Sequence, residues 1–516
     1  MKPTDYESDH TIGENNVQPM GLDIHNPVFA VSAGLIILFV IAVLLMPESA
    51  SAVLNGAKSW SLEYCGWLLM GAGNVFVVFC LVILCLPVGR IRLGGPDAKP
   101  EFSTWSWFAM LFAAGMGIGL MFWCVAEPIG YYTNWAGTPL NVAPGTTEAA
   151  DMALVATMFH WGIHPWAIYS VVGLSLAFFA FNKGLPLTIR SAFYPLLGER
   201  VWGRIGDFID ILAVVATIFG LATSLGFGAQ QASSGLNFLF ETPDTIKTQI
   251  FIIVGVTIVA IASVARGIGG GVRILSNINM ILALLLMMFV LIVGPTLAIF
   301  NYVYSTAVGY AEHILQLSNW IDRKDTEFMQ NWTIFYWAWW VSWSPFVGTF
   351  IARISKGRTV REFIAAVLIV PVVLTLVWMS TFGGSALVQA QMGVGDLANG
   401  LSSVSLAMFQ MLENLPLTQI TSLLAIILVL VFFVTSSDSG SLVVDSITAG
   451  GKLNPPVFQR VFWATMEGVI AIALLYGGGA AALGTLQAGA ITTALPFTVV
   501  LLVMCISLYM GLMDEK

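Results

Sequence analysis

Aromatic side chains gather in two stretches of the sequence that could bind a cation. Residues 160–169 and 332–343 together contain seven of the chain's 17 tryptophans. In a helix, Tyr336, Trp340 and Trp343 follow the spacing i, i+4 and i+7, so they share one face. A quaternary ammonium has no proton to donate, and a protein therefore binds it by surrounding it with electron-rich ring faces. The two stretches predict such a pocket, although large aromatic side chains also fill protein cores.

A glycine-rich stretch could bind the opposite charge. Residues 115–119 read GMGIG, and this density of glycine favours an unwound segment whose free backbone N–H groups can take a carboxylate. Gly119 stands at the point where a lone cation would require an acidic counter-ion. A pocket that combines this segment with the aromatic stretches predicts a zwitterionic ligand.

Hydroxyl side chains at 435–439 suggest an ion site next to the end of an apolar helix. A hard alkali cation needs several oxygen ligands. The hydroxyls of Thr435 and Ser436, with backbone carbonyls freed in the glycine-rich segment and in the hydroxyl-bearing helix, could supply five. The candidate ligands are Ala113, Met116, Phe432, Thr435 and Ser436. The alternative is that these hydroxyls bond back to carbonyls one turn earlier in their own helix.

The remaining candidates for chemistry are weaker. His160 and His164 are four residues apart and could form half of a metal site, but no third ligand is evident. The cysteines lack metal-ligand spacing and are expected to be free thiols, with no disulfide and no zinc: Cys65, Cys80, Cys85, Cys124 and Cys505. Acidic residues near the ends of apolar segments are expected to be structural: Glu127, Asp151, Asp207, Asp210 and Glu467. Without a nucleophile elbow or phosphate loop, we expect neither an enzyme nor a cofactor other than a coupling ion.

The elements that must position these residues are membrane helices. Of 516 residues, 57% are hydrophobic and 10% charged, with a mean hydropathy of +0.85, so polar side chains are too few to cover a soluble globule. This composition predicts an all-α polytopic membrane protein. Twelve spans are expected, at 27–46, 64–87, 102–133, 150–181, 205–240, 248–265, 274–302, 329–352, 363–385, 416–438, 457–477 and 482–511.

The distribution of basic residues predicts the orientation of these spans. If both termini are cytoplasmic, all but four of the 21 basic residues lie inside, the exceptions being Lys58, Lys247, Arg323 and Lys324. That asymmetry follows the positive-inside rule. The tail 1–26 is too acidic for a cleaved signal and is expected to be a disordered cytoplasmic lead. The net charge of −8 gives no reason to expect a nucleic-acid partner.

Two spans carry features that interrupt a helix. The third contains the glycine-rich segment and the eighth contains Ser344-Pro345, where proline removes a backbone donor. Because these spans are five apart, spans 3–7 and 8–12 could form two five-helix repeats of opposite topology, as in secondary transporters. The alternative is close packing by glycine and an ordinary proline kink. The expected divisions are a tail 1–26, two extra N-terminal helices 27–101, a first repeat 102–302, a periplasmic connection 303–328, a second repeat 329–511 and a short cytoplasmic end 512–516.

These motifs resemble the betaine/choline/carnitine transporter (BCCT) family, and the likeness covers almost the whole chain. The matching stretches are 115–128, 160–169, 219–226, 337–359 and 435–439. The resemblance implies a leucine-transporter-like core in spans 3–12, a homotrimer in the bacterial inner membrane, and alternating-access transport of quaternary ammonium or sulfonium compounds.

The resemblance also implies a role for individual residues. The family's aromatic box corresponds to Trp161, Trp166, Tyr169 and Trp340, with further substrate contacts at Trp339, Trp343, Ala114, Met116, Gly117 and Gly119. The family's sodium site corresponds to Ala113, Met116, Phe432, Thr435 and Ser436. A second sodium site would use Thr217 and Phe346, but this chain has Leu221 where sodium-coupled betaine carriers have a second hydroxyl.

Two positions favour one branch of the family. Choline carriers tend to have an acid in place of Gly119, and sodium-independent carnitine exchangers have a methionine near Val347. We therefore expect a sodium symporter that imports glycine betaine or a related osmoprotectant zwitterion such as dimethylsulfoniopropionate. The alternative is a sodium-independent carnitine-type exchanger. A receptor or an intramembrane enzyme would need a signalling part or a catalytic set that the sequence does not show.

Overall fold

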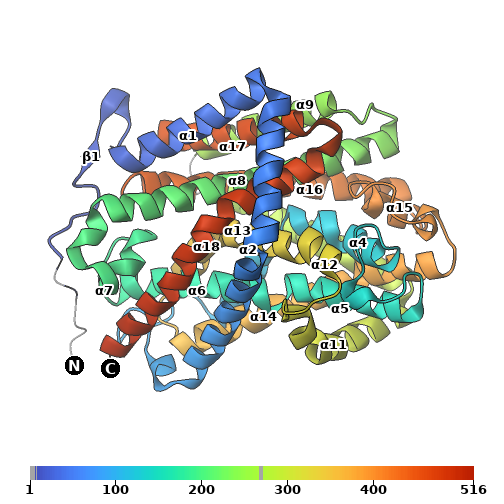
Figure 1. Cartoon of the computed structure of the whole chain (residues 1–516), viewed down its shortest axis with the longest axis horizontal. Helices are drawn as coiled ribbons and strands as arrows, with labels where there is room; N and C mark the ends of the chain where they lie inside the picture. The colour runs from blue at the N-terminus through green and yellow to red at the C-terminus, as the bar shows by residue number, and fades with distance from the viewer. Residues whose placement is uncertain (1–5, 7, 267–270, 516) are drawn as a thin grey trace.

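The computed structural model describes residues 6, 8–266 and 271–515 and is a bundle of helices (Figure 1). The helices are α1 (Asn26–Leu45), α2 (Pro47–Cys85), α3 (Thr104–Gly115), α4 (Ile118–Tyr132), α5 (Thr147–Trp161), α6 (Ile163–Phe181), α7 (Tyr194–Leu197), α8 (Arg204–Phe240), α9 (Ile246–Arg266), α10 (Gly271–Val293), α11 (Thr296–Ser318), α12 (Thr326–Phe328), α13 (Ile334–Ile354), α14 (Val360–Gln391), α15 (Ala407–Glu413), α16 (Thr418–Thr448), α17 (Val457–Gly478) and α18 (Ala482–Asp514). Short helical turns are η1 (Pro19–Gly21), η2 (Pro87–Arg90), η3 (Pro139–Asn141), η4 (Arg190–Phe193), η5 (Gly198–Trp202), η6 (Met329–Thr333), η7 (Asp396–Asn399) and η8 (Gly479–Ala481). Strands β1 (Asn16–Val17) and β2 (Ile24–His25) form one antiparallel pair.

The helices confirm a multi-pass membrane protein. Within the described residues, nine helical stretches are long and apolar enough to cross a bilayer, or ten if the bent pair α3–α4 counts as one span. One of these stretches, Val457–Asp514, is 58 residues long and covers the last two expected spans. The count of twelve spans and the inverted repeat stay predictions.

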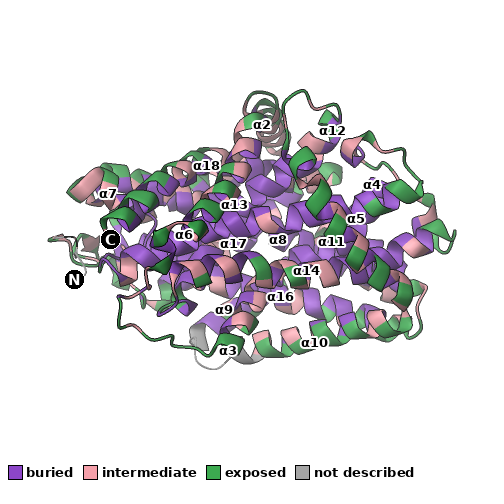
Figure 2. Cartoon of the chain, turned by 90° about the horizontal axis from the view of Figure 1, so that it is seen from below, coloured by how far each residue is buried: buried purple, intermediate pink, exposed green. Residues whose placement is uncertain are grey.

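Burial separates a central group of helices from an outer one, as Figure 2 shows. In the most apolar window of the α5–α6 stretch 89% of residues are buried, against 22% in α9. The outer helices α1, α9 and α10 turn large apolar side chains outward, for example Leu38, Phe251 and Ile281. In a membrane protein such a surface faces lipid, whereas the buried helices are free to line a site.

Two expected elements differ from the structure. The segment expected as one span at 274–302 is two helices, α10 and α11, separated at Gly294-Pro295 because proline has no N–H for the helical ladder. Helix α11 continues to Ser318, so much of the expected connecting segment 303–328 is helical.

The interruption expected at Ser344-Pro345 is absent, because α13 runs unbroken from Ile334 to Ile354. Proline leaves the carbonyl four residues earlier without its usual donor. Here that carbonyl belongs to Val341, and the Ser344 hydroxyl donates to it at 2.7 Å. The serine therefore replaces the missing bond, and the expectation of two matching interrupted helices is wrong on this side.

The N-terminal tail is folded where the structure describes it, which corrects the expectation of a disordered lead. Its hairpin β1–β2 is tied to the loop after α16, where Asn16 donates to the Ala449 carbonyl at 2.8 Å. Asp23 pairs with Lys452 at 2.5 Å, and His25 contacts Asp207 of α8 at 2.8 Å. The tail residues 1–5 and 7, and Lys516 at the other end, lie outside the described residues.

Two described residues near the ends of the chain, Tyr6 and Glu515, contact residues at the end of α6 or just after it. Tyr6 stacks on Phe179 at 6.4 Å between ring centroids, and Glu515 pairs with Lys183 at 2.5 Å.

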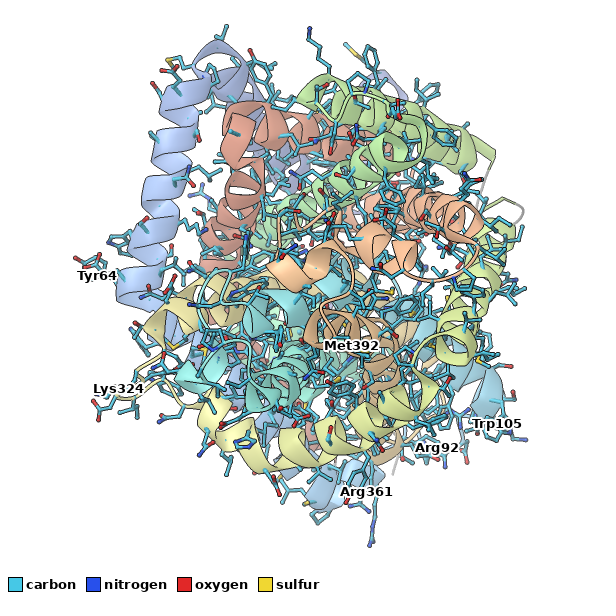
Figure 3. All side chains as sticks on the ribbon, turned by 90° about the vertical axis from the view of Figure 1, so that its right-hand side faces the viewer. Tyr64, Arg92, Trp105, Lys324, Arg361 and Met392 are labelled. Carbon is cyan, nitrogen blue, oxygen red and sulfur yellow. The ribbon has the colours of Figure 1, made fainter. Side chains whose placement is uncertain are left out.

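In Figure 3 the basic residues Arg92 and Arg361 lie close to one another at the lower right, whereas Lys324 lies at the left edge. The placement of the termini in the cytoplasm stays a prediction.

Candidate substrate-binding site

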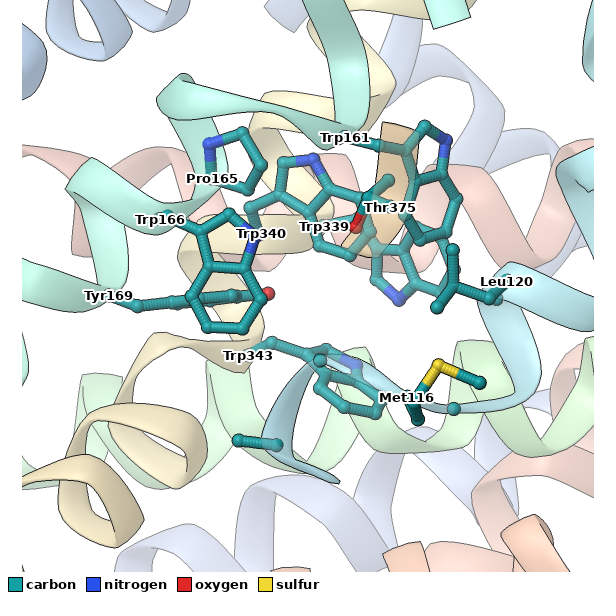
Figure 4. A pocket seen from close by; sticks show the side chains of 14 residues that line it. Met116, Leu120, Trp161, Pro165, Trp166, Tyr169, Trp339, Trp340, Trp343 and Thr375 are labelled. Carbon is teal, nitrogen blue, oxygen red and sulfur yellow. The ribbon is translucent and has the colours of Figure 1, made fainter. Parts of the chain in front are cut away.

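A central cavity lies at the break between α3 and α4, against α6, α13 and α14, and leaves about 490 Å³ unfilled by protein atoms. Figure 4 shows the side chains around it. All ten residues expected to contact substrate line this cavity: Trp161, Trp166, Tyr169, Trp339, Trp340, Trp343, Ala114, Met116, Gly117 and Gly119. Four further residues line it that were not expected: Gly115, Leu120, Pro165 and Thr375.

The aromatic side chains meet at steep angles and so form walls of a box. Trp161 and Trp340 lie 4.8 Å apart between ring centroids with an interplanar angle of 71°. Tyr169 stands at 85° to Trp166 and at 80° to Trp340. Trp339 stacks on Trp340 at 4.8 Å and 17°, which backs that wall. Ring faces that surround a small space from several sides are suited to a quaternary cation.

Three indole N–H groups around the cavity are bonded to protein acceptors. Trp340 donates to the His160 carbonyl at 2.9 Å, and Trp343 donates to the Gly220 carbonyl at 3.0 Å. Trp339 donates to the Ser224 hydroxyl at 3.2 Å. Each bond fixes the plane of a ring. The walls are therefore held in place before any ligand arrives.

The unwound segment separates α3 from α4, which are bent by 63° relative to each other. Met116 and Gly117 have extended backbone conformations. A Cβ on Gly115 would lie 2.7 Å from the Trp166 ring, and one on Gly119 would lie 2.7 Å from Trp339 and 2.8 Å from Trp161. Glycine is thus required at both positions because indole rings pack directly on the backbone.

The start of α4 can attract an anion. Its first residue is Ile118, and Gly117 at the N-cap offers no side chain to the first N–H groups. Unpartnered N–H groups and the helix dipole make such an end a site for a carboxylate. Gly117 and Gly119 both line the cavity. The cavity thus has a place for a cation in the box and for an anion at this helix end.

A second cavity adjoins the first, with about 580 Å³ unfilled by protein atoms. Four of the five expected ligands of sodium line it: Ala113, Met116, Thr435 and Ser436. Phe432 does not line it, and its carbonyl accepts a bond from Thr435 at 3.2 Å. Two additional hydroxyls, those of Ser276 and Ser439, line it as well.

The hydroxyls at 435 and 436 lie inside α16, which continues to Thr448, and not next to a helix end as expected. Thr435 also donates to the Val431 carbonyl at 3.1 Å, which is the back-bonding considered as the alternative. A threonine oxygen that donates in this way keeps its lone pairs and can still accept a cation. The geometry is therefore compatible both with back-bonding by Thr435 and with sodium binding to its hydroxyl oxygen.

No described contact joins the two residues expected to form a second sodium site. Thr217 is fully buried and donates to the Ala213 carbonyl at 2.7 Å. Phe346 lines the second cavity instead. Leu221 packs so closely on α16 that a Cβ on Gly440 would lie 2.3 Å from it.

The two histidines considered as a metal pair have separate partners. His160 contacts Glu127 at 2.8 Å and the Thr333 hydroxyl at 2.9 Å. His164 faces Asn74 at 3.2 Å and the Ser318 hydroxyl at 3.3 Å. Over the described part of the chain, no group of three or more His, Cys, Asp or Glu side chains is arranged to hold a metal ion.

Glu127 and Thr375 were missed by sequence reasoning. Thr375 brings a hydroxyl to the cavity from α14, and no motif marks it. Glu127, expected to be structural, is fully buried, and the unpredicted feature is the bond of 2.7 Å that it accepts from Trp161, which lines the cavity. The available signal was the rule that an ionisable residue within a membrane helix is a functional candidate.

A family model described as "BCCT, betaine/carnitine/choline family transporter" matches residues 27–516. The chain belongs to this family. The expected resemblance is thereby confirmed, and the site lies in a transporter fold of BCCT type.

Three relatives match this chain over more than nine tenths of their own length. Glycine betaine transporter 1 of Vibrio parahaemolyticus is 59% identical, covering 99% of this chain and 98% of that protein. A glycine betaine/proline/choline/ectoine transporter of the same organism is 55% identical, covering 98% of this chain and 91% of its own length. Glycine betaine transporter OpuD of Bacillus subtilis is 45% identical, covering 95% and 94% respectively. These likenesses support a multi-pass bacterial membrane transporter.

One solved structure is a distant likeness. A manganese transporter mutant of Eremococcus coleocola is 11% identical and superposes with a TM-score of 0.46 over 82% of this chain and 90% of that chain. A likeness at this level supports no conclusion about the fold, which rests on the helices described above.

Proposed function

We propose that this chain imports glycine betaine, or a close zwitterionic analogue such as dimethylsulfoniopropionate, by sodium symport with alternating access. It would work as a homotrimer in the bacterial inner membrane with both termini in the cytoplasm. The observation that carries the proposal is the single cavity that joins an aromatic box to the free end of α4. The relatives named as glycine betaine transporters support the same substrate class.

The size and chemistry of the cavity favour a short zwitterion. The trimethylammonium group would lie among Trp161, Tyr169 and Trp340, where each desolvated ring contact contributes about 0.5–2 kcal/mol. The carboxylate would accept bonds from the N–H groups at Gly117 and Gly119. No acidic side chain lines the cavity among the described residues. A lone cation would thus be paired only through the rings, which favours betaine over choline.

Sodium coupling has a physical basis in the residues that the two cavities share. Ala114, Met116 and Trp343 line both cavities. An ion bound to the carbonyls of the unwound segment would fix that segment in the conformation that offers its N–H groups to the substrate. Because Leu221 replaces a hydroxyl at the second site, we infer one sodium per substrate.

The test of the sodium site is the double variant Thr435→Ala/Ser436→Ala. Removing both hydroxyls leaves too few oxygens to replace the ion's hydration shell, so the sodium concentration for half-maximal betaine uptake should rise about tenfold or coupling should be lost. The matched control is Thr421→Ala/Ser422→Ala, which removes the same two side chains from α16 outside both cavities. An unchanged sodium dependence in the first variant would contradict the assignment.

A competition experiment tests the substrate class. Glycine betaine uptake should be inhibited by dimethylsulfoniopropionate at concentrations similar to those of unlabelled betaine, and less strongly by choline, proline or ectoine. If choline inhibited uptake as strongly as unlabelled betaine does, the N-terminal end of α4 would not distinguish a ligand with a carboxylate from one without it. Stronger inhibition by carnitine, combined with exchange in the absence of sodium, would favour the exchanger instead.

A further inference from the structure

Glu127 lies behind the aromatic box and accepts four hydrogen bonds, although its side chain is fully buried. One carboxylate oxygen accepts from the Tyr131 hydroxyl at 2.8 Å and lies 2.8 Å from His160 Nδ1. The Tyr131 hydroxyl also lies 3.0 Å from His160 Nδ1, and with the Tyr131 proton directed at Glu127 that nitrogen donates to the carboxylate. The other oxygen accepts from Trp161 Nε1 at 2.7 Å and from the Tyr336 hydroxyl at 2.6 Å. Trp161 belongs to the aromatic box, and Tyr336 stacks against Trp340 of the box.

The surroundings of Glu127 fit the ionised carboxylate. All four contacts can donate, and none needs a proton from the carboxyl group. The second nitrogen of His160 faces the Thr333 hydroxyl at 2.9 Å, which can donate to it, so a neutral ring with its proton on Nδ1 satisfies both neighbours. Arg323 lies over the Phe328 ring at 5.7 Å and is itself paired with Asp325 at 2.7 Å. Among the described contacts, Glu127 therefore has no cationic partner of its own.

The negative charge of Glu127 can act on the cavity through the two aromatic side chains, Trp161 and Tyr336, that donate to it. An N–H or O–H that donates to an anion shifts electron density toward its ring, which strengthens the attraction between the ring face and a cation. Trp161 lines the cavity directly. Tyr336 stacks on Trp340 at 5.8 Å between centroids and 26° between planes. In a site with little water this effect is weakly screened.

We propose that Glu127 is the counter-charge of the cation site and acts through Trp161 and Tyr336 without touching the ligand. The proposal rests on the proposed function, because it requires that the box binds a quaternary cation. It explains how the cavity can hold a positive group although no acid lines it. Glu127 is thus a positioning residue that also supplies charge.

The test compares two ligands of the same shape and different charge. In 3,3-dimethylbutyrate a carbon atom replaces the nitrogen of glycine betaine, while the three methyl groups and the carboxylate remain. Affinities of both ligands would be measured by calorimetry with purified protein in sodium-containing buffer, for the wild type and for Glu127→Gln. Glutamine keeps the shape of the side chain and removes its charge.

We expect Glu127→Gln to weaken betaine binding about tenfold or more and to change dimethylbutyrate binding less than about threefold. The control Thr333→Val removes the hydroxyl that faces His160 at 2.9 Å without changing charge, and it should leave the ratio of the two affinities unchanged. Equal losses for both ligands in Glu127→Gln would show a purely structural role and overturn the proposal.

Two further variants keep the test decisive. If Glu127→Gln does not fold, or if dimethylbutyrate binds too weakly to measure, Glu127→Asp and Tyr336→Phe are compared for betaine. Glu127→Asp keeps the charge, whereas Tyr336→Phe removes one of the donors to Glu127. Glu127→Asp should therefore bind betaine more tightly than Tyr336→Phe does, and both variants should bind it more weakly than the wild type. Wild-type affinity in both variants would contradict the proposal. A wild type that binds no betaine would instead refute the proposed function, which is a separate outcome.

Discussion

At the residue scale, what a ligand meets in the cavity is decided by bonds made behind it. Trp339, Trp340 and Trp343 are held by their N–H groups at 3.2, 2.9 and 3.0 Å, so the planes of their rings are fixed. Glycine at 115 and 119 lets the indoles approach the backbone. A pre-formed box costs less conformational entropy on binding than one that assembles around its ligand.

Replacing a wall of the box should abolish most of the affinity. Trp161→Leu and Trp340→Leu should each weaken betaine binding about tenfold or more, since a desolvated ring contact is worth up to about 2 kcal/mol. The measurement is a titration by calorimetry with the purified variants. Near-native affinity in both would rule out the box as the cation site.

The control for these variants must be a tryptophan outside the site. Trp332 is buried and donates to the Ala136 carbonyl at 3.1 Å, so it is unsuitable. Trp67 on α2 is 58% exposed and lines neither cavity. Trp67→Leu should leave betaine affinity unchanged.

The residues around the cavity were largely predictable because family motifs carry them at fixed positions. The contribution of Glu127 was not, since its proximity to Trp161 depends on the packing of α4 against α5. Thr375 comes from α14, far along the chain, and its position follows only from the tertiary fold. Sequence spacing describes one helix at a time, and such contacts join different helices.

At the element scale, the site is positioned by the break between α3 and α4 and by the unbroken course of α13 through Pro345. The break between α3 and α4 frees backbone groups, whereas α13 continues through Pro345 and carries aromatic residues along its length. Proline alone predicted an interruption there. The preceding serine replaces the lost bond at the Val341 carbonyl, and this contact depends on the side-chain conformation of Ser344.

This repair can be tested with a mutant cycle. Ser344→Ala should lower the free energy of unfolding by about 1–2 kcal/mol, because the Val341 carbonyl loses its donor in a buried helix. Ser344→Ala/Pro345→Ala should recover most of that loss, since alanine at 345 restores the backbone N–H. The melting temperature in detergent reports both effects. If the double variant is no more stable than Ser344→Ala, the hydroxyl does not act as the substitute.

At the scale of the whole molecule, a lipid-facing shell surrounds a polar and aromatic centre. Outer helices such as α9 expose apolar side chains, and α5, α6 and α13 are buried around the cavities. Hydropathy predicted apolar helices along most of the chain, whereas the number of membrane spans stays a prediction. It could not place the folded tail, because the link between Asp23 and Lys452 joins residues that are distant in sequence and polar in character.

The most direct test of the central claim is uptake of radiolabelled glycine betaine into proteoliposomes that contain the purified protein. With sodium outside and none inside, betaine should accumulate above its external concentration, and dissipating the sodium gradient should abolish the accumulation. Simultaneous labelling of sodium should give about one ion per betaine, because Leu221 removes a hydroxyl from the second site. Equal accumulation without a sodium gradient, or uptake that requires a second quaternary ammonium compound inside the vesicles, would contradict a sodium symporter.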